Sequence, residues 1–324
     1  NRVCGNVSGV RIPPSPPEIM KERELSKSSI EDRRHVGRRF LVSLAIGMCV
    51  TSLSSDHLSY AAALGVPDDL FIVALGDSYP SGEGNPPFEE TTNIDGVNQC
   101  HRSELAYPAI VARDIHAEFR NVACSGATVE AVLHGGWNET PQVLALRNKT
   151  DVVILQINGN VIDNRGIFAE CQEKDCDEGS LTYTEVREAI RDPQNQQDTE
   201  QLLETVLEKA PIANVFVVEY PNPVNSIGIS LARSTGVASR STRAMISMAD
   251  MASSEINELN KRAIAAVGSD RVHYIPTSIG GPQTVYLSGN AALHPNSEGH
   301  RQLAKDVEQE FSRLYRAPSQ DALH

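Results

Sequence analysis

Continuous apolar runs alternate with amphipathic segments along most of the chain after residue 64. Runs in which nearly every position is apolar are typical of strands buried on both faces of a sheet, and weaker runs mark shorter strands. On this basis the predicted strands are Leu70–Leu75, Asn121–Cys124, Val152–Ile157, Ala213–Tyr220 and Arg271–Ile275. Apolar residues at helical spacing predict helices over Ala106–Phe119, Asp198–Lys209, Met248–Val267 and Glu298–Tyr315.

The order of these elements predicts the fold class. Strands that alternate with helices favour an α/β protein, a three-layer α/β/α sandwich with a mostly parallel, flavodoxin-like sheet of about five strands. In such sheets ligands bind at the carboxyl ends of the strands. Only Asp177–Gln197 is polar enough to be a long surface excursion.

The N-terminal part of the chain has a different pattern. Four arginines between positions 33 and 39 precede an apolar stretch of 14 residues, 40–53, which contains Ser, Gly and Thr. This stretch is too short and too polar for a comfortable transmembrane helix. Small residues up to Ala63 complete the pattern of a secretory signal peptide over 33–63, although a buried helix of the mature fold is the alternative. Residues 1–32 are expected to be a disordered or untranslated extension, 64–318 the folded domain, and 319–324 a tail.

Composition and charge exclude several classes of protein. Apolar residues make up 40% of the chain, which excludes disorder throughout, and no apolar run is long enough for a polytopic membrane protein or a stable membrane anchor. The first 64 residues have a net charge of +3 and the remainder −16. Because so acidic a body repels phosphate backbones, nucleic acid is an unfavourable partner.

The cysteines are consistent with export. Four of the six lie beyond the predicted signal peptide, at positions 100, 124, 171 and 176. An oxidising compartment favours disulfides, and four cysteines permit three pairings. Cys171 and Cys176 are close enough in sequence to close a small loop, which would leave Cys100 with Cys124. Free buried thiols are the alternative.

Four short segments carry residues that suit nucleophilic catalysis. Ser78 directly follows the first predicted strand, where a tight turn can expose a nucleophile. Gly126 lets a backbone N–H approach a ligand closely, and the Asn160 amide can donate to a developing oxyanion. His294, just before the last predicted helix, is a candidate general base. Taken singly, each of these residues is more often structural; Ser78, for example, suits a helix N-cap.

Other chemistries are disfavoured. No Gly-Lys-Ser/Thr follows the Gly-rich loop at 76–84, so a phosphate-binding loop is excluded. The chain has no C-x₂-C pair and no H-E-x-x-H motif, which argues against zinc. We therefore predict no cofactor and no metal.

Together the four segments resemble one family, the GDSL lipase/esterases, also called SGNH hydrolases. Gly-Asp-Ser at 76–78, Gly126, Gly-Asn at 159–160 and His294 follow the family's order. The surrounding sequences LGDSYPSGEG, QCHRSELAYP, ACSGAT and LHPNSEGHRQLA look like the secreted actinobacterial type. The resemblance covers about residues 70–176 and 285–306, and it makes 64–318 a catalytic domain.

The resemblance implies a role for each matched residue. Ser78 would be the nucleophile, and His294 would take its proton and return it to the leaving alcohol. The N–H groups of Ser78 and Gly126 and the side-chain amide of Asn160 would form the oxyanion hole. The disulfides of the secreted type correspond to Cys100–Cys124 and Cys171–Cys176.

The chain departs from the family's pattern in two places. The third block reads Asn-Gly-Asn-Val at 158–161 where the family usually has Gly-Gly-Asn-Asp, although the donor Asn160 is kept. Position 291 is Ala, where the family usually has Asp three residues before the His. We expect the main-chain carbonyl of Ala291 to orient His294, as in some members of the family. Asn290 is a weaker candidate, and a distant Asp or Glu is the alternative.

These observations predict a secreted serine ester hydrolase that acts on a small-molecule or lipid ester. The first alternative is a non-catalytic member of the SGNH family, which keeps the fold and binds a ligand but has lost Asp at position 291. The second is a carbohydrate O-acetyl esterase. Aromatic residues are only 5% of the chain and the lone Trp137 does not form a sugar-stacking platform, which favours acyl esters over glycans.

Overall fold

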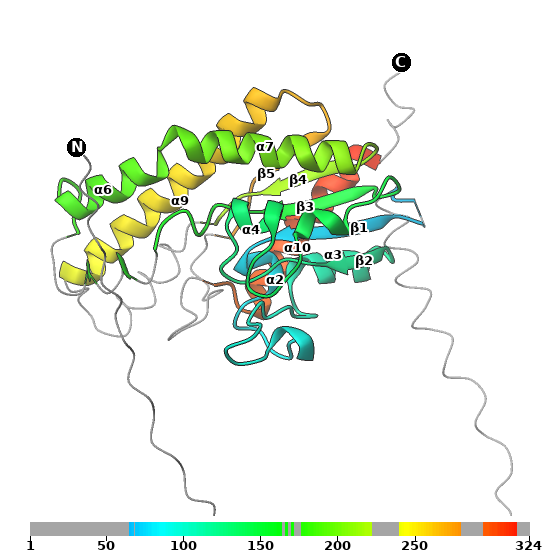
Figure 1. The fold of residues 1–324 in the computed structure, drawn as a ribbon, viewed down its shortest axis with the longest axis horizontal. Coiled ribbons are helices and arrows are strands. Elements are labelled where there is room, and N and C mark those ends of the chain that lie inside the picture. The colour runs from blue at the N-terminus through cyan, green and yellow to red at the C-terminus, as the bar shows by residue number, and fades with distance from the viewer. Residues whose placement is uncertain are drawn as a thin grey trace, which may run out of the picture. The chain divides into compact units, whose positions relative to one another are not determined.

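A sheet of five parallel strands forms the centre of the fold (Figure 1). The computed structural model describes residues 65–67, 69–163, 166–167, 170–171, 176–221, 240–279 and 294–315. All of them belong to one compact unit, Cys49–His324. The predicted extension 1–32, signal peptide 33–63 and tail 319–324 lie outside the described residues, as do positions 290 and 291.

The topology of the sheet is doubly wound. The strands are β1 (Phe71–Gly76), β2 (Glu118–Asn121), β3 (Val152–Gln156), β4 (Asn214–Val218) and β5 (Val272–Ile275). Their order across the sheet is β2-β1-β3-β4-β5, and every neighbouring pair is parallel. The order reverses between β1 and β3, so the chain leaves these strands in diverging directions and room for a ligand opens at their carboxyl ends. The predicted fold class is confirmed.

Helices cover both faces of the sheet. The α-helices are α2 (Ser78–Ser81), α3 (Tyr107–Asp114), α4 (Val129–His134), α6 (Leu181–Ile190), α7 (Pro193–Lys209), α9 (Arg240–Val267) and α10 (Ser297–Tyr315). Short 3₁₀ helices lie at Glu90–Thr92 and Gln142–Ala145. Ile72 and Ile154 enter a core shared with α3 and α10, whereas Val73 and Val153 enter a core shared with α4 and α7. Because successive residues of a strand face opposite sides, both faces are buried and the central strands are apolar throughout.

The segment between α3 and β2 corrects two predictions. The helix predicted over Ala106–Phe119 ends at Asp114, and the strand predicted at Asn121–Cys124 is instead Glu118–Asn121. His116 has a φ of 59°, a left-handed conformation that does not continue a helix. The strand β2 lies at the edge of the sheet and its residues are alternately exposed, so it lacks the continuous apolar run of a central strand.

The stretch Asp177–Gln197, predicted as a long surface excursion, is mostly helical. It contains α6 and the first turn of α7. The Ser180 hydroxyl caps α6 by accepting a hydrogen bond from the N–H of Tyr183. Only three side chains of α6 are buried, which explains the weak apolar signal: Thr182, Val186 and Ile190.

The described part of the chain contains two disulfides, Cys100–Cys124 and Cys171–Cys176, as the sequence predicts. The first joins the loop after α2 to the segment that follows β2. Among the residues with described positions, no helix combines the length and the apolar character that a membrane crossing requires.

Candidate active site

The carboxyl end of β1 leads directly into the serine block. Gly76 has a φ of 126°, and a Cβ there would lie 2.0 Å from the carbonyl oxygen of Gln156, so only glycine fits between β1 and β3. Asp77 is fully buried and acts as the N-cap of α2, accepting the N–H of Tyr79 at 3.2 Å. Ser78 is therefore the first residue of α2, and it is half-buried at the strand end.

Asp77 is also tied to the end of β4. The hydroxyl of Tyr220 donates a hydrogen bond to the Asp77 carboxylate and accepts one from the N–H of Gly159 at 3.0 Å. Burial raises the pKa of Asp77 from 3.8 to about 7, opposed by hydrogen bonds from Tyr220, Tyr79 and Gly159. A Cβ at Gly159 would lie 2.9 Å from both Asp77 and Tyr220, so the glycine of this block is a steric requirement.

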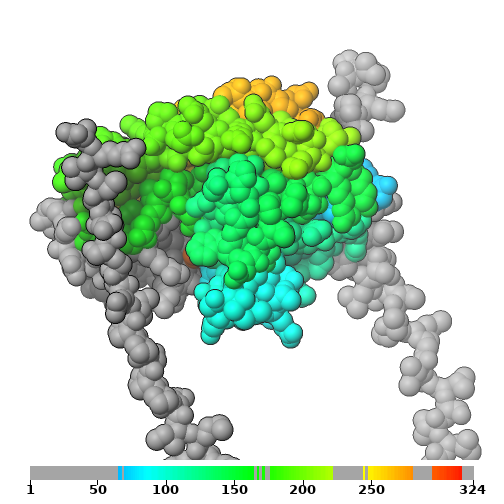
Figure 2. Space-filling model, in the orientation of Figure 1, coloured from blue at the N-terminus to red at the C-terminus, as the bar shows by residue number. Residues whose placement is uncertain are grey.

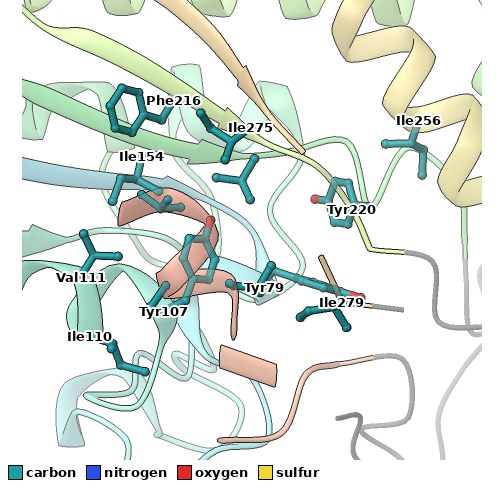
Figure 3. Close-up of a cluster of buried hydrophobic side chains, with 14 of the residues drawn as sticks. Tyr79, Tyr107, Ile110, Val111, Ile154, Phe216, Tyr220, Ile256, Ile275 and Ile279 are labelled. Carbon is teal, nitrogen blue, oxygen red and sulfur yellow. The ribbon is translucent and has the colours of Figure 1, made fainter. Parts of the chain in front are cut away.

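Helix α9 holds Tyr220 in place. The Asn257 side chain accepts the N–H of Tyr220 and donates to its carbonyl, each at 2.9 Å. The Tyr220 ring meets that of Tyr79 edge-on, with centroids 5.1 Å apart, in the apolar group beyond the strand ends (Figure 3). A buried network of hydrogen bonds therefore links the carboxyl ends of β1, β3 and β4.

The segment after β3 shows why Asn can stand at position 158, where the family usually has glycine. Asn158 has a φ of 84°, a conformation that glycine adopts freely and that Asn tolerates better than most residues. Its buried amide donates to Thr199 of α7 at 3.0 Å and to Asn260 of α9 at 2.7 Å. Asn158 thus keeps the backbone that a glycine would provide and fastens the block to two helices.

Gly126 and Asn160 come together at the same edge of the sheet. Gly126 has a φ of 83°. The Asn160 amide donates to the carbonyl of Ala127, the next residue, at 3.0 Å. Because a primary amide carries two hydrogens, this bond orients the group and leaves a second hydrogen for another acceptor. Both residues are half-buried.

The histidine block packs against the serine block. The ring of His294 lies beside that of Tyr79, with centroids 5.6 Å apart, and is half-buried. The buried Asn85, on the loop after α2, donates to the carbonyl of Pro295 at 2.8 Å. Asn296 then caps α10 by accepting the N–H groups of residues 298 and 299. These contacts place His294 next to Tyr79, the residue that follows Ser78.

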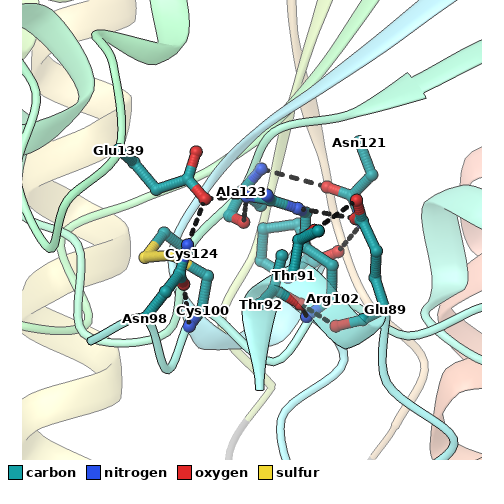
Figure 4. A network of polar contacts seen from close by, with 11 residues as sticks. Glu89, Thr91, Thr92, Asn98, Cys100, Arg102, Asn121, Ala123, Cys124 and Glu139 are labelled. Atoms are coloured by element: carbon teal, nitrogen blue, oxygen red, sulfur yellow. Dashed lines mark hydrogen bonds and ion pairs between the residues drawn. A yellow bond between two sulfur atoms is a disulfide. The ribbon is translucent and has the colours of Figure 1, made fainter. Parts of the chain in front are cut away.

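A charged network anchors the loops around the Cys100–Cys124 disulfide (Figure 4). Arg102 pairs with Glu89 at 3.1 Å and with Glu139 at 2.8 Å, and it donates to the carbonyl of Ala123 at 3.4 Å. Glu139 also accepts a bond from Asn98 at 2.6 Å. The network thereby fixes the segment around the Cys100–Cys124 disulfide and the turn that ends at Glu139.

A cavity of about 290 Å³ opens beside this network. Glu89, Arg102, Arg120 and residues 139–142 are among those that line it, whereas Ser78, Asn160 and His294 are not. Within the described part of the chain, no group of three or more His, Cys, Asp or Glu side chains is arranged to hold a metal ion.

The structure thus gathers Ser78, Gly126, Asn160 and His294 at one edge of the sheet, while Ala291 lies outside the described residues. Sequence reasoning missed the residues that support them, Asn85, Tyr220 and Asn257, since nothing in a local pattern links positions so far apart. It also gave Trp137 no part in the site. The structure places the Trp137 indole against Gly126, where a Cβ would lie 3.7 Å from its six-membered ring.

Comparison with known proteins agrees with the fold and with the family that the sequence resembles. The model of the GDSL-like Lipase/Acylhydrolase family matches residues 74–302. Lipase 1 of Streptomyces coelicolor is 29% identical over 212 residues, 63% of this chain and 72% of that protein. A lipase of Streptomyces rimosus is 28% identical over 197 residues, 60% of this chain and 66% of its own length.

Solved structures show the same fold. Phospholipase A1 from Streptomyces albidoflavus has a TM-score of 0.56 at 24% identity, covering 74% of this chain and 98% of its own. The extracellular lipase from Streptomyces rimosus has a TM-score of 0.57 at 23% identity, and the match covers 74% of this chain and 99% of that lipase. The chain belongs to the GDSL-like lipase/acylhydrolase family, and it is an ester hydrolase.

Proposed function

We propose that the protein is a secreted serine hydrolase that cleaves carboxylic esters of lipids through an acyl-enzyme on Ser78. The observation that carries the proposal is the placement of His294 beside Tyr79, at the strand end where Ser78 begins α2. Relatives named as lipases, one of them extracellular, support lipid esters and export.

The proposed reaction has two halves. The Ser78 hydroxyl oxygen bonds to the ester carbonyl carbon while His294 takes its proton, and the carbonyl oxygen becomes an oxyanion. The N–H groups of Ser78 and Gly126 and the free amide hydrogen of Asn160 receive that charge. The carbon–oxygen bond to the alcohol then breaks, and His294 returns the proton to the alcohol. In the second half, His294 takes a proton from water as the water oxygen bonds to the acyl carbon. The bond from that carbon to the Ser78 oxygen then breaks, His294 returns the proton to Ser78, and the acid is released.

We further propose that the Ala291 carbonyl accepts the Nδ1–H of His294, so that Nε2 faces Ser78. Position 291 carries no carboxylate, and a neutral carbonyl can still fix the tautomer of the imidazole. The proposal predicts that Ala291→Asp preserves or raises turnover, since a carboxylate at that place stabilises the imidazolium more strongly. A loss of turnover in a folded Ala291→Asp protein would show that another group orients His294.

The experiment that tests the function is labelling with a serine-reactive fluorophosphonate. We expect the protein to be labelled and Ser78→Ala to be unlabelled, with Ser81→Ala as the matched control on the same helix. Absence of labelling in the folded protein would favour a non-catalytic, ligand-binding member. Activity confined to acetylated polysaccharide in a comparison with p-nitrophenyl esters of increasing chain length would favour a carbohydrate O-acetyl esterase.

A further inference from the structure

The turn that carries Trp137 is built from an unfavourable residue. Gly136 and Glu139 are paired by two backbone hydrogen bonds, of 3.2 and 2.8 Å, and the two residues between them have φ of 57° and 59°. A two-residue turn with both φ positive favours Asn and Gly, and a bulky aromatic residue at its first position is an outlier. A left-handed conformation is unfavourable for any residue other than glycine, and Asn tolerates it better than an aromatic residue does.

Trp137 is also exposed, so burial of its indole does not offset that cost. Its relative exposure is 59%, although it is a large apolar side chain and the only tryptophan in the chain. Local stability therefore gives no reason for tryptophan at this position. An exposed aromatic residue held in an unfavourable conformation is typical of a contact with a ligand.

The position of the indole indicates which ligand. Its six-membered ring lies against Gly126, the glycine of the proposed oxyanion hole. The neighbouring turn, Ile94–Asn98, is joined to the Trp137 turn by bonds from Asn138 to the Val97 carbonyl and from Asn98 to Glu139. Figure 2 shows this loop, in cyan, against the green segment that follows β2. Ile94 and Val97 are exposed as well, at 45% and 52%.

The two turns carry two charged side chains, both of them acidic: Asp95, which accepts a hydrogen bond from Gln99 at 3.2 Å, and Glu139. Glu139 is engaged by Arg102 and by Asn98, and the Arg102 side chain is only 10% exposed. The rest of the folded part of the chain is strongly acidic. A surface of this kind suits an uncharged hydrocarbon chain and offers nothing to an anionic group.

We propose that Trp137 determines substrate specificity by contacting the hydrocarbon chain of the acyl group while the ester carbonyl occupies the oxyanion hole beside Gly126. This inference rests on the proposed function, because it assumes that the ester is held at Ser78. Covering each methylene of the chain is worth about a factor of four. The indole therefore favours esters with medium and long chains over acetate.

The first test is Trp137→Asn, since Asn suits the left-handed turn and should leave the melting temperature at or above that of the parent protein. We expect kcat/KM for p-nitrophenyl octanoate to fall about tenfold, with p-nitrophenyl acetate changed by less than about twofold. The control is Ile212→Asn, an equally exposed apolar residue that precedes the amino end of β4. Equal losses on both esters, or no loss on octanoate, would overturn the proposal.

The second test does not need turnover. Because Trp137 is the only tryptophan, its emission reports this surface directly. In the Ser78→Ala protein we expect dodecylphosphocholine to shift the emission to the blue and to protect it from acrylamide, and xylobiose to do neither. No shift with the alkyl ligand, or a shift with the sugar alone, would overturn the proposal. If the fluorophosphonate experiment excludes Ser78 as the nucleophile, this measurement still decides whether Trp137 binds hydrocarbon.

Discussion

Asp77 has two roles at the residue scale, because one buried carboxylate caps α2 and also accepts the Tyr220 hydroxyl. Burial disfavours its charged form, which is why its pKa rises from 3.8 to about 7 in the folded chain. The folded state thus binds this proton more tightly than the unfolded state does. Its contribution to stability is largest below about pH 4, falls as the pH rises to about 7, and is constant above that.

We predict that Asp77→Asn removes this pH dependence. The pKa difference between 3.8 and about 7 corresponds to at most about 4 kcal/mol. Relative to the parent protein, the free energy of unfolding of Asp77→Asn should therefore rise between about pH 4 and pH 8 by up to that amount. Urea unfolding of both proteins at the two pH values measures the difference. If the difference in the free energy of unfolding between the two proteins is the same at both pH values, the Asp77 carboxylate titrates normally.

A second residue-scale prediction concerns Asn160. If its free amide hydrogen meets the oxyanion, Asn160→Ala should lower kcat about 10²–10³-fold and change KM little, because the bond strengthens as charge develops. Steady-state kinetics on one soluble ester measures both constants. Unchanged kcat in a protein that melts like its parent would exclude this role.

At the scale of elements, α3 and α10 depend on each other. Ala106, the N-cap of α3, offers no side-chain acceptor, and the first N–H of the helix, from Tyr107, is instead received by Nδ1 of His300 on α10 at 3.2 Å. His300 is fully buried. Burial and the nearby His294 lower its pKa from 6.5 to about 3, so the ring stays neutral and can accept the bond.

We predict that His300→Leu lowers the free energy of unfolding by about 1–3 kcal/mol near pH 8, since it leaves the Tyr107 N–H buried without an acceptor. His300→Asn, which keeps an acceptor oxygen, should cost less. Because the folded-state pKa of His300 lies below 6.5, its contribution is full above about pH 6.5 and declines toward pH 3. The difference in the free energy of unfolding between the parent protein and His300→Leu should therefore become smaller as the pH falls from about 6.5 to 3. Denaturant titrations at several pH values test this; a gap that widens in acid would contradict it.

The elements differ in how far the sequence predicts them. β1, β3 and β4 are buried on both faces, and their apolar runs identify them directly. β2 lies at the edge, so its alternating exposure conceals it, and the prediction falls about three residues late. α6 buries only a narrow stripe and therefore reads as a polar excursion. A sequence pattern reports burial, and it fails where an element is mostly exposed.

The site shows the same limit. Ser78, Gly126 and Asn160 could be found because each follows a strand end, and His294 because it precedes the last helix. Tyr220 and Asn257 could not, because their roles arise from side-chain contacts between distant segments. A single aromatic residue makes no sequence pattern, and the two features that single out Trp137, its contact with Gly126 and the positive φ values of its turn, are visible only in the structure.

At the scale of the whole molecule, the two disulfides should differ in what they contribute. Cys100–Cys124 spans 24 positions and Cys171–Cys176 only 5. Restricting the unfolded chain stabilises the fold by about 3.5 kcal/mol for the longer loop and about 2 kcal/mol for the shorter one. We predict that the double variant Cys100→Ser/Cys124→Ser is destabilised more than Cys171→Ser/Cys176→Ser. Urea unfolding of the two variants compares them, and the reverse order would contradict the prediction.

The contact between Asn85 and Pro295 has a consequence for the timing of synthesis. It joins positions 210 residues apart, and it brings together the segments that carry Ser78 and His294. While the chain grows from its N-terminus, the first strand and its serine are made long before the histidine exists. In the proposed mechanism, the reacting pair therefore meets only after residue 295 has been synthesised, and a shorter nascent chain would not cleave the esters of the cell that makes it.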